Sequence, residues 1–524
     1  MAEYDYVVVG SGSAGGTIAT RLSEDGDVSV LLIEAGGSPD EVAEIAIPPA
    51  WPAIWGSAAD WAFMTTPQGG TGGVAHAWPR GKVLGGSSTI NAMVHLRGHR
   101  ADFDRWAYDG NVGWDYDHVL PYFQRMEDCP GRDTQYRGAG GPLQPARAAE
   151  PNPTSAAFIE AARELGHPVN DDFNGYESEG AGWHDLLIRD GQRHSVAAAY
   201  LAPAAGRENL TIATRATARR LTFAGSRCTG VEYDHDGRAQ QVTARREVIV
   251  SAGVIGSPHL LLLSGVGPAD DLRALGVPVV VDLPGVGANL HDHPLLGIVY
   301  EASQPVPPPT SNLAESSMFW RSDPRAVVPD LQFMFIHVPF HPPTLEAPAN
   351  SFTIAVGVMH PVSRGTLRLR SADPAEPPEI DPAYLSDDAD VRALLRGIAK
   401  ARELAATDAF APWLAREVLP GDDVLDEAAL RDFIARGTGT YYHPVGTCRM
   451  GIDRLAVVDP QLRVHGVEGL RVADASIMPS IVTANTNPAS IMIGEKAADL
   501  VRDAAVTPLA GGGRRVGEAT AATG

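Results

Sequence analysis

Tyr6-Val7-Val8-Val9-Gly10-Ser11-Gly12-Ser13-Ala14-Gly15 lies near the start of this 524-residue chain and predicts a buried strand, a tight glycine turn and a helix. The glycines permit the turn, a close approach of the backbone to a pyrophosphate, and close packing of helix on strand. Glu34 ends the next predicted strand, where a carboxylate can accept hydrogen bonds from ribose hydroxyls. The pattern predicts an α/β domain that binds a dinucleotide. Because Glu34 would repel a 2′-phosphate, the pattern argues against NADP, whereas NAD and FAD remain open.

Composition bounds the class of protein. A chain of 524 residues is too long for one small core, so we expect two domains. No apolar run approaches the roughly 18 residues of a membrane-spanning helix, and nothing near Met1 resembles a secretory signal. The three cysteines, Cys129, Cys228 and Cys448, form no close pair, which predicts a reducing, cytoplasmic location and no thiolate metal site.

The formal net charge of -22 argues against binding of nucleic acid or of anionic membranes. Two interpretations remain for this charge. It attracts a cationic substrate, or it serves solubility, which is the commoner reason for such a charge.

The rest of the chain divides by composition. Residues 40–80 are rich in Pro, Trp and Gly and predict an extended loop that wraps a large ligand. Residues 209–252 alternate with β-branched side chains and predict strands, whereas residues 256–264 predict a buried helix. Residues 296–385 shift to Pro-rich, strand-like sequence, which indicates the body of a second domain inserted into the first. Residues 386–436 look helical.

Several blocks of the sequence are rich in glycine or carry His or Asn beside proline. They are Arg80-Gly81-Lys82-Val83-Leu84-Gly85-Gly86-Ser87-Ser88-Thr89-Ile90-Asn91, residues 252–267, residues 284–293, His443-Pro444-Val445-Gly446-Thr447-Cys448-Arg449-Met450-Gly451, residues 469–476, and Ala484-Asn485-Thr486-Asn487-Pro488-Ala489. Taken alone, His443 and Asn487 are loop residues beside proline, more often structural than catalytic. His291, Asp292 and His293 are three adjacent loop residues, which make poor joint ligands, so we expect no metal site.

In order and spacing, these blocks resemble the signatures of the GMC (glucose–methanol–choline) flavoprotein oxidoreductases over nearly the whole chain. They look most similar to the choline dehydrogenase and choline oxidase branch. The resemblance implies an α/β fold in which a Rossmann-like FAD-binding domain carries an inserted α+β substrate domain built on an antiparallel sheet. The expected FAD-binding domain comprises residues 1–145, 190–295 and 439–505, the substrate domain residues 146–189 and 296–438, and a disordered tail residues 506–524.

The resemblance also implies the residues that contact FAD: Gly10, Ser11, Gly12, Ser13, Ala14, Gly15, Glu34, Ala35, Trp61, Val83, Gly86, Ser87, Asn91, Ala92, Met93, Val94, Ala218, Asp474, Ala475, Asn485 and Thr486. Some relatives carry a flavin-linking His in the position of Ile90, and isoleucine cannot form that bond. We therefore expect non-covalent FAD, with His95 and His99 as poor substitutes for the linking His.

The family reaction is hydride transfer from an alcohol carbon to flavin N5, with loss of the hydroxyl proton. His443 matches the catalytic His of the family, and imidazole suits the role because its pKa lies near operating pH. Asn487 matches the second catalytic position, where an amide can hydrogen-bond the substrate oxygen. The expected substrate pocket comprises Glu315, Trp320, Phe335, His337, Tyr441 and Tyr442, with Trp61 as a further candidate for an aromatic cage around a quaternary ammonium.

The leading hypothesis is an FAD-dependent oxidase or dehydrogenase that converts a primary alcohol to the aldehyde. Choline-like and small aryl or alkyl alcohols are the candidate substrates, and further oxidation to the acid stays open. Oxygen, a quinone or another carrier is the candidate electron acceptor, and a homodimer is the candidate assembly. The alternatives are a hydroxynitrile lyase that holds FAD without net redox chemistry and an NAD-dependent dehydrogenase.

Overall fold

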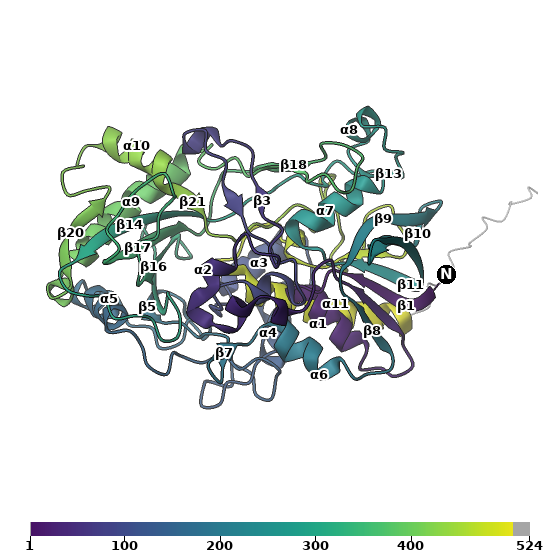
Figure 1. Cartoon of the computed structure of the whole chain (residues 1–524), viewed down its shortest axis with the longest axis horizontal. Coiled ribbons are helices and arrows are strands. Elements are labelled where there is room, and N and C mark those ends of the chain that lie inside the picture. The colour runs from purple at the N-terminus through teal and green to yellow at the C-terminus, as the bar shows by residue number, and fades with distance from the viewer. Residues whose placement is uncertain (1, 507–524) are drawn as a thin grey trace, which may run out of the picture.

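The N-terminal βαβ unit has the form that the sequence predicts. The structure is a computed structural model, and it describes residues 2–506 of the chain (Figure 1). Strands β1 (Ala2–Val9) and β2 (Val30–Ile33) pair in parallel, and helix α1 (Ser13–Leu22) connects them. The turn before α1 requires glycine, because Gly10 has a φ of +94° and a Cβ on Gly15 would lie 1.9 Å from the Gly10 carbonyl oxygen.

The first sheet has seven strands in the order β8-β2-β1-β11-β10-β9, with β22 paired to β11. Strands β8, β2, β1, β11 and β22 run parallel, so their carboxyl ends meet at one edge. Ligands bind at this edge in open α/β sheets. The strands not yet bounded are β8 (Leu210–Ala213), β9 (Ala216–Ala224), β10 (Arg227–His235), β11 (Arg238–Val250) and β22 (Leu470–Val472).

The second sheet is antiparallel throughout, which confirms the expected fold class. Its order is β20-β14-β17-β16-β15-β5, with β21 paired to β14. Helices α5 (Pro153–Glu164) and α9 (Asp388–Ala405) pack against it, and the two sheets occupy opposite ends of the molecule in Figure 1. Its strands are β5 (Gly180–Trp183), β14 (Pro294–Ala302), β15 (Ser316–Trp320), β16 (Leu331–Ile336), β17 (Ser351–Val358), β20 (Leu414–Leu419) and β21 (Thr438–Thr440).

Two expectations about local structure need correction. Residues 386–436 do contain α9 and α10 (Glu427–Gly437), but the segment between these helices forms the edge strand β20. Its Ala, Arg and Glu residues favour a helix intrinsically, and pairing with β14 overrides that preference. Residues 40–80 are not loop alone, because they include several short helical turns and α2 (Trp51–Ile54). The tail lies, from residue 507 on, outside the described residues.

Two helices position the loops at the carboxyl edge of the first sheet. Helix α7 (Gly253–Leu263) follows β11 and is largely buried, as predicted for residues 256–264. Helix α11 (Thr486–Val506) packs against α1, where a Cβ on Gly494 would lie 2.7 Å from the carbonyl oxygen of Ala14. The remaining helices and strands are α3 (Arg100–Tyr108), α4 (Tyr116–Arg125), α6 (Ala202–Ala204), α8 (Ala269–Ala274), β3 (Phe63–Met64), β4 (Ala77–Trp78), β6 (Ile188–Arg189), β7 (Gln192–Arg193), β12 (Val266–Gly267), β13 (Val281–Asp282), β18 (Thr366–Arg368) and β19 (Glu379–Asp381).

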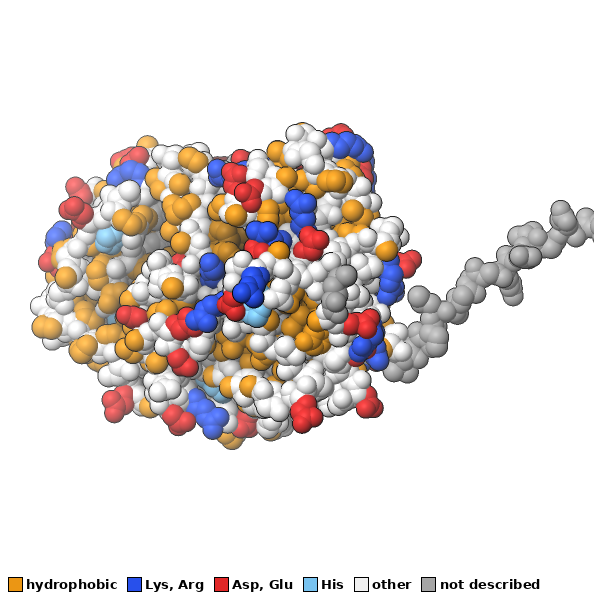
Figure 2. Space-filling view, turned by 45° about the vertical axis from the view of Figure 1, so that its right-hand side comes forward, with side chains coloured by type: hydrophobic (Ala, Val, Ile, Leu, Met, Phe, Trp, Pro, Cys, Tyr) orange, Lys and Arg blue, Asp and Glu red, His pale blue; other side chains and the backbone are white. Residues whose placement is uncertain are grey.

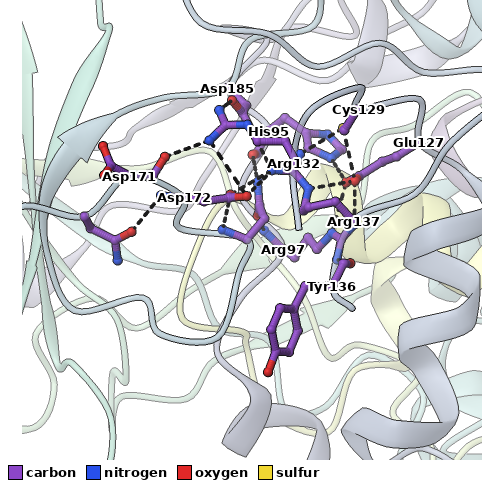
Figure 3. A network of polar contacts seen from close by, with 12 residues as sticks. His95, Arg97, Glu127, Cys129, Arg132, Tyr136, Arg137, Asp171, Asp172 and Asp185 are labelled. Carbon is purple, nitrogen blue, oxygen red and sulfur yellow. Dashed lines mark hydrogen bonds and ion pairs between the residues drawn. The ribbon is translucent and has the colours of Figure 1, made fainter. Parts of the chain in front are cut away.

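A buried network of charged side chains ties several loops together (Figure 3). The carboxylate of Glu127 accepts hydrogen bonds from His95, Arg97 and Arg137 at 2.6, 2.5 and 2.9 Å. Arg137 also donates to Asp185 at 2.8 Å. Because these members come from three separate stretches of the chain, the network holds the loop before α3, the end of α4 and the segment after β5 in one arrangement.

Candidate active site

A cavity of about 550 Å³ lies between the carboxyl edge of the first sheet and the second sheet. That volume is typical of small-molecule and cofactor sites. The loops after β1, β2 and β11 and the segment 79–94 form one part of its wall, and residues of β14 and β16 form another. Residues 441–444, 474–475 and 485–487 complete the wall, so segments far apart in sequence meet here.

Most of the residues predicted to contact the cofactor line this cavity: Gly10, Gly12, Ser13, Ala14, Glu34, Ala35, Trp61, Gly86, Ser87, Asn91, Ala92, Met93, Val94, Ala218, Asp474, Ala475, Asn485 and Thr486. Ser11, Gly15 and Val83 do not line it and instead lie directly behind its wall. The Ser11 hydroxyl donates to Glu34 at 2.7 Å. Val83 is buried and pairs with Gly37 through an isolated parallel bridge.

The glycine-lined part of the cavity has the features of a dinucleotide cradle. Gly12 and Gly86 face each other so closely that a Cβ on Gly86 would lie 2.7 Å from the Cα of Gly12. The first turn of α1 carries no side-chain cap, so its backbone N–H groups stay available to an anion. The Glu34 carboxylate accepts from the Ser11 and Gly36 backbone N–H groups at 3.0 and 2.8 Å, which fixes it at the end of β2.

Two further observations test whether a large cofactor fits. The carbonyl oxygen of the Asn485 side chain and the amide nitrogen of the Asn487 side chain are buried without a hydrogen-bond partner among the described residues. Gly253 has a φ of +78°, and a Cβ there would meet nothing within 4 Å. Buried polar groups are normally paired, so these orphaned atoms on the cavity wall fit contacts with a bound polar molecule.

His443 lies on the cavity wall between several aromatic side chains. The ring of Tyr441 stacks on the imidazole, with centroids 4.5 Å apart. Burial and, to a smaller extent, the positive charge of Arg80 together lower the pKa of His443 to about 3. The imidazole is therefore neutral at physiological pH and has a lone pair that can accept a proton. Its pKa lies far below operating pH, which corrects the expectation from the sequence and makes it a weaker base than an ordinary histidine.

A chain of contacts determines which nitrogen of the His443 imidazole carries the proton and which is unprotonated. The Nε2 of His293 lies 3.2 Å from the carbonyl oxygen of Met359, and this oxygen only accepts, so His293 carries its proton on Nε2. Burial lowers the pKa of His293 well below its usual range, so its Nδ1 is unprotonated. That Nδ1 lies 3.1 Å from the Nδ1 of His443, which must then be the donor. His443 consequently presents an unprotonated Nε2.

The structure places Asn485, rather than Asn487, beside this nitrogen. The Asn485 amide nitrogen donates to the Nε2 of His443 at 3.1 Å. Asn487 instead accepts a hydrogen bond from the Ser13 hydroxyl at 2.6 Å, on the glycine-lined side. Helix α11 begins at Thr486, so the two asparagines leave the backbone in different directions at its first turn. The resemblance assigns the catalytic role to Asn487 and a cofactor contact to Asn485, whereas in the structure it is Asn485 that contacts His443.

Asp292 holds the segment of His443 from behind the cavity wall. Its carboxylate accepts from the His443 backbone N–H at 2.8 Å and from the hydroxyls of Thr440 and Tyr384. His291 points elsewhere, because its Nε2 accepts from the Ile481 backbone N–H at 3.0 Å. Within residues 2–506, no group of three or more His, Cys, Asp or Glu side chains is placed to hold a metal ion.

Four residues predicted for the substrate pocket do not line the cavity: Glu315, Trp320, Phe335 and His337. Phe335 packs in the core against Phe158 and Phe352, with centroids 5.6 and 5.5 Å away. The reason is the alternation of side chains along a strand, because in β16 it is Met334 and Ile336 that face the cavity. Of the expected pocket residues, Tyr441 and Tyr442 do line it.

The sequence did not single out several residues that line the same region: Trp51, Trp55, Leu295, Met334, Ile336 and Phe340. The two tryptophans come from the Pro- and Trp-rich segment that predicted a ligand-wrapping loop, and that composition was the available signal. The apolar residues of β14 and β16 gave no signal, because both strands are almost wholly buried and show no alternation of polar and apolar residues.

Comparison with known proteins agrees with this geometry. Two family models described as GMC oxidoreductase match residues 4–295 and 361–494. The chain is 42% identical to human mitochondrial choline dehydrogenase over 537 residues, covering 95% of this chain and 90% of the relative. It is 42% identical to the oxygen-dependent choline dehydrogenase of Brucella ovis, covering 97% of each. Pyridoxine 4-oxidase from Mesorbium loti superposes with a TM-score of 0.93 at 40% identity, covering 95% of this chain and 99% of that one.

The chain belongs to the GMC oxidoreductase family. It is an FAD-dependent alcohol oxidoreductase, which confirms the class of enzyme and the cofactor expected from the sequence. Within the described residues, no helix is long and apolar enough to cross a membrane.

Proposed function

We propose that the chain oxidises a small primary alcohol bound against His443, with FAD held non-covalently in the glycine-lined part of the cavity. The unprotonated Nε2 of His443 carries this proposal, because it is a neutral base on the wall of a cofactor-sized cavity. When bound, the flavin supplies the hydride acceptor for the alcohol carbon. The relatives and the solved structure named above are dehydrogenases and an oxidase, and none of them is a lyase.

The residues of the chain handle the proton and the oxygen. The Nε2 of His443 takes the hydroxyl proton, and the resulting imidazolium stabilises the developing alkoxide. The Asn485 amide, 3.1 Å from that nitrogen, is placed to donate to the same oxygen, the role that the sequence assigned to Asn487. Asn487 and Ser13 then belong to the cofactor side of the site.

The proposal of non-covalent FAD rests on the side chains near the cavity. Ile90 lines it and has no nucleophilic atom. The Nε2 of His95 donates to Glu127 within the buried network, and the Nδ1 of His99 accepts from the Ala101 backbone N–H at the start of α3. Neither of these imidazoles lines the cavity. Acid precipitation should therefore leave the yellow chromophore in the supernatant, whereas a yellow pellet would indicate a covalent bond.

The test of the function is anaerobic mixing of the FAD-loaded protein with a series of primary alcohols, followed by air. Bleaching of the flavin by at least one alcohol supports the proposal. His443→Gln should keep the flavin and bleach about 10²–10⁴-fold more slowly, the range lost with a general base. Failure of every alcohol to bleach the flavin, or an unchanged rate in His443→Gln, would overturn it. Fast recovery in air identifies oxygen as acceptor, and slow recovery a quinone or other carrier.

A further inference from the structure

We infer that the site of proposed alcohol oxidation takes a neutral primary alcohol with a flat aromatic body and discriminates against quaternary ammonium alcohols such as choline. This inference rests on the proposed function. It departs from the substrate that the names of the choline dehydrogenase relatives state. The inference is based on the shape and the charge of the cavity wall next to His443.

Aromatic rings form the wall next to His443. Tyr442 lies 4.7 Å from Trp55, and Trp55 lies 5.1 Å from Trp51, measured between ring centroids. Phe340 continues this wall, 6.4 Å from Trp51. The second sheet adds apolar side chains to the lining from β14 and β16, those of Leu295, Met334 and Ile336. Such surfaces favour a flat apolar body through area burial and ring contacts.

Within residues 2–506, no carboxylate lines this aromatic end. The acidic residues that line the cavity are Glu34, Glu376 and Asp474. The Glu34 carboxylate accepts from the Gly36 backbone N–H at the end of β2. The Asp474 carboxylate accepts from the Gly253 backbone N–H and the Ser257 hydroxyl at 3.0 and 2.5 Å.

The third acid lies with the first sheet as well. The segment of Glu376 is held near β9, because Arg220 donates to the Ala372 carbonyl oxygen at 3.1 Å. Glu315, which the sequence offered as a partner for a cation, does not line the cavity. Its Oε2 accepts from the Asn152 backbone N–H at 2.7 Å, and its Oε1 is buried without a partner among the described residues. A quaternary ammonium beside His443 would therefore lack a countercharge in contact with it.

A cation lines the cavity instead. Arg80 donates to the carbonyl oxygens of Pro79 and Tyr442 at 2.6 and 2.7 Å, and no carboxylate among the described residues forms an ion pair with it. Its charge is felt at His443, whose pKa it lowers. Asp292 and Asp60 offset this charge in part, but neither lines the cavity. Two hydroxyls and a backbone N–H already occupy the Asp292 carboxylate, and Asp60 accepts from the Arg80 backbone N–H at 2.8 Å.

The overall charge does not reverse this local balance. The chain carries a net charge of -22, but acidic and basic side chains are interspersed on the face shown in Figure 2. Exposed charges are screened by salt over about 10 Å, whereas charges in a buried wall are screened much less. Selectivity between a cation and a neutral alcohol therefore depends on Arg80 and on the absence of a lining acid beside it.

Isosteric pairs of alcohols test the inference, because each pair differs only in a quaternary nitrogen or a quaternary carbon. Choline is paired with 3,3-dimethylbutan-1-ol, and 4-(trimethylammonio)benzyl alcohol with 4-tert-butylbenzyl alcohol. We expect the neutral member of each pair to bleach the flavin at least about 10-fold faster at low concentration, a difference of about 1.4 kcal/mol. The aromatic neutral alcohol should be the fastest of the four. Equal or faster bleaching by the cations would overturn the inference.

A binding measurement separates this inference from the proposed function. Tertiary alcohols with two methyl groups on the carbinol carbon have no hydride to give, so quenching of tryptophan fluorescence reports their affinity without turnover. The 4-tert-butylphenyl compound should bind at least about 10-fold more tightly than its 4-trimethylammonio counterpart. If no primary alcohol bleaches the flavin, the proposed function fails, and this affinity ratio still decides the selectivity.

A matched pair of variants tests the missing countercharge. Met334 lines the aromatic end, and Glu and Gln have side chains of similar length. Met334→Glu should shift the choline-to-dimethylbutanol rate ratio toward choline by about 10-fold relative to Met334→Gln, because only the former adds a carboxylate. The same ratio in both variants would contradict the electrostatic explanation.

Discussion

At the scale of single residues, the contact between His443 and His293 determines where the reactive lone pair lies. His293 accepts from the Nδ1 of His443 because its own proton is held by the Met359 carbonyl oxygen. A wrong tautomer would place a proton where the base is needed. In the proposed reaction the imidazole of His443 contacts the substrate, and the imidazole of His293 positions that of His443.

His293→Leu removes the acceptor of the His443 Nδ1–H and should lower the rate of flavin bleaching by up to about 10⁴-fold, the loss known for a catalytic histidine in the wrong tautomer. His293→Asn keeps an oxygen that can accept and should recover a large part of this loss. Stopped-flow bleaching of both variants, with flavin content as the control for folding, gives the comparison. Equal losses in both would show a packing role instead.

The low pKa of His443, about 3, predicts the pH dependence of catalysis. The neutral imidazole is the active form, so activity is lost only as pH falls through the pKa of the folded protein. The acid limb of kcat/KM should then lie well below pH 6.5, the ordinary pKa of histidine. A limb near pH 6.5 would show that the substrate-free site is more hydrated than the structure indicates.

Asn485 and Asn487 allow a direct comparison of two neighbouring amides. Asn485→Ala removes the donor beside His443 and should slow bleaching by roughly 10–10³-fold, as for loss of an oxyanion donor. Asn487→Ala breaks the contact with Ser13 and should mainly weaken retention of FAD during dialysis. The reverse pattern would return the catalytic role to Asn487. The sequence could predict that this block is catalytic, but not which amide faces the base, because α11 starts between them.

At the scale of elements, strand β16 shows why the substrate pocket was the hardest part to predict. All of its residues are buried, so no polar–apolar alternation reveals which side chains meet the cavity. The glycine turn after β1 was predictable because a specific backbone geometry requires glycine there. The pocket, by contrast, is formed by packing between distant elements.

Two neighbouring variants in β16 test this assignment of faces. Phe335→Leu should lower the free energy of unfolding by ~1–2 kcal/mol, because it leaves a gap against Phe158 and Phe352, with little effect on alcohol oxidation. Ile336→Ala should instead raise kcat/KM for bulkier alcohols relative to smaller ones, since it widens the cavity. Thermal unfolding and a series of alcohols of increasing size provide the two measurements. A change of selectivity in Phe335→Leu alone would reverse the assignment.

At the scale of the whole molecule, the Glu127 network links loops that the sequence separates widely (Figure 3). Glu127→Gln would leave the guanidinium groups of Arg97 and Arg137 buried with less countercharge. It should lower the free energy of unfolding by ~3–5 kcal/mol. Glu160→Gln, which removes an exposed pair with Arg163, should leave the unfolding midpoint unchanged and is the matched control. Similar midpoints for the two variants would show that the buried network contributes little.

Two domains and an antiparallel second sheet could be predicted from length and family resemblance, and the structure bears out that fold class. The arrangement of the sheets around one cavity could not, because it depends on contacts such as that of α1 with α11. The domain boundaries expected from the sequence stay a prediction.

The hydrogen bond between Ser13 and Asn487 has a consequence for the synthesis of the protein. Ser13 leaves the ribosome 474 residues before Asn487, its hydrogen-bond partner. At translation rates of about 5–20 residues per second, roughly half a minute to a minute and a half separates them. Until Asn487 has been made, the nascent chain lacks one side of this contact, so we expect FAD to bind after the last part of the cradle has been synthesised. The supply of the flavin precursor during expression should then affect the yield of active, FAD-loaded protein more than the total yield of polypeptide.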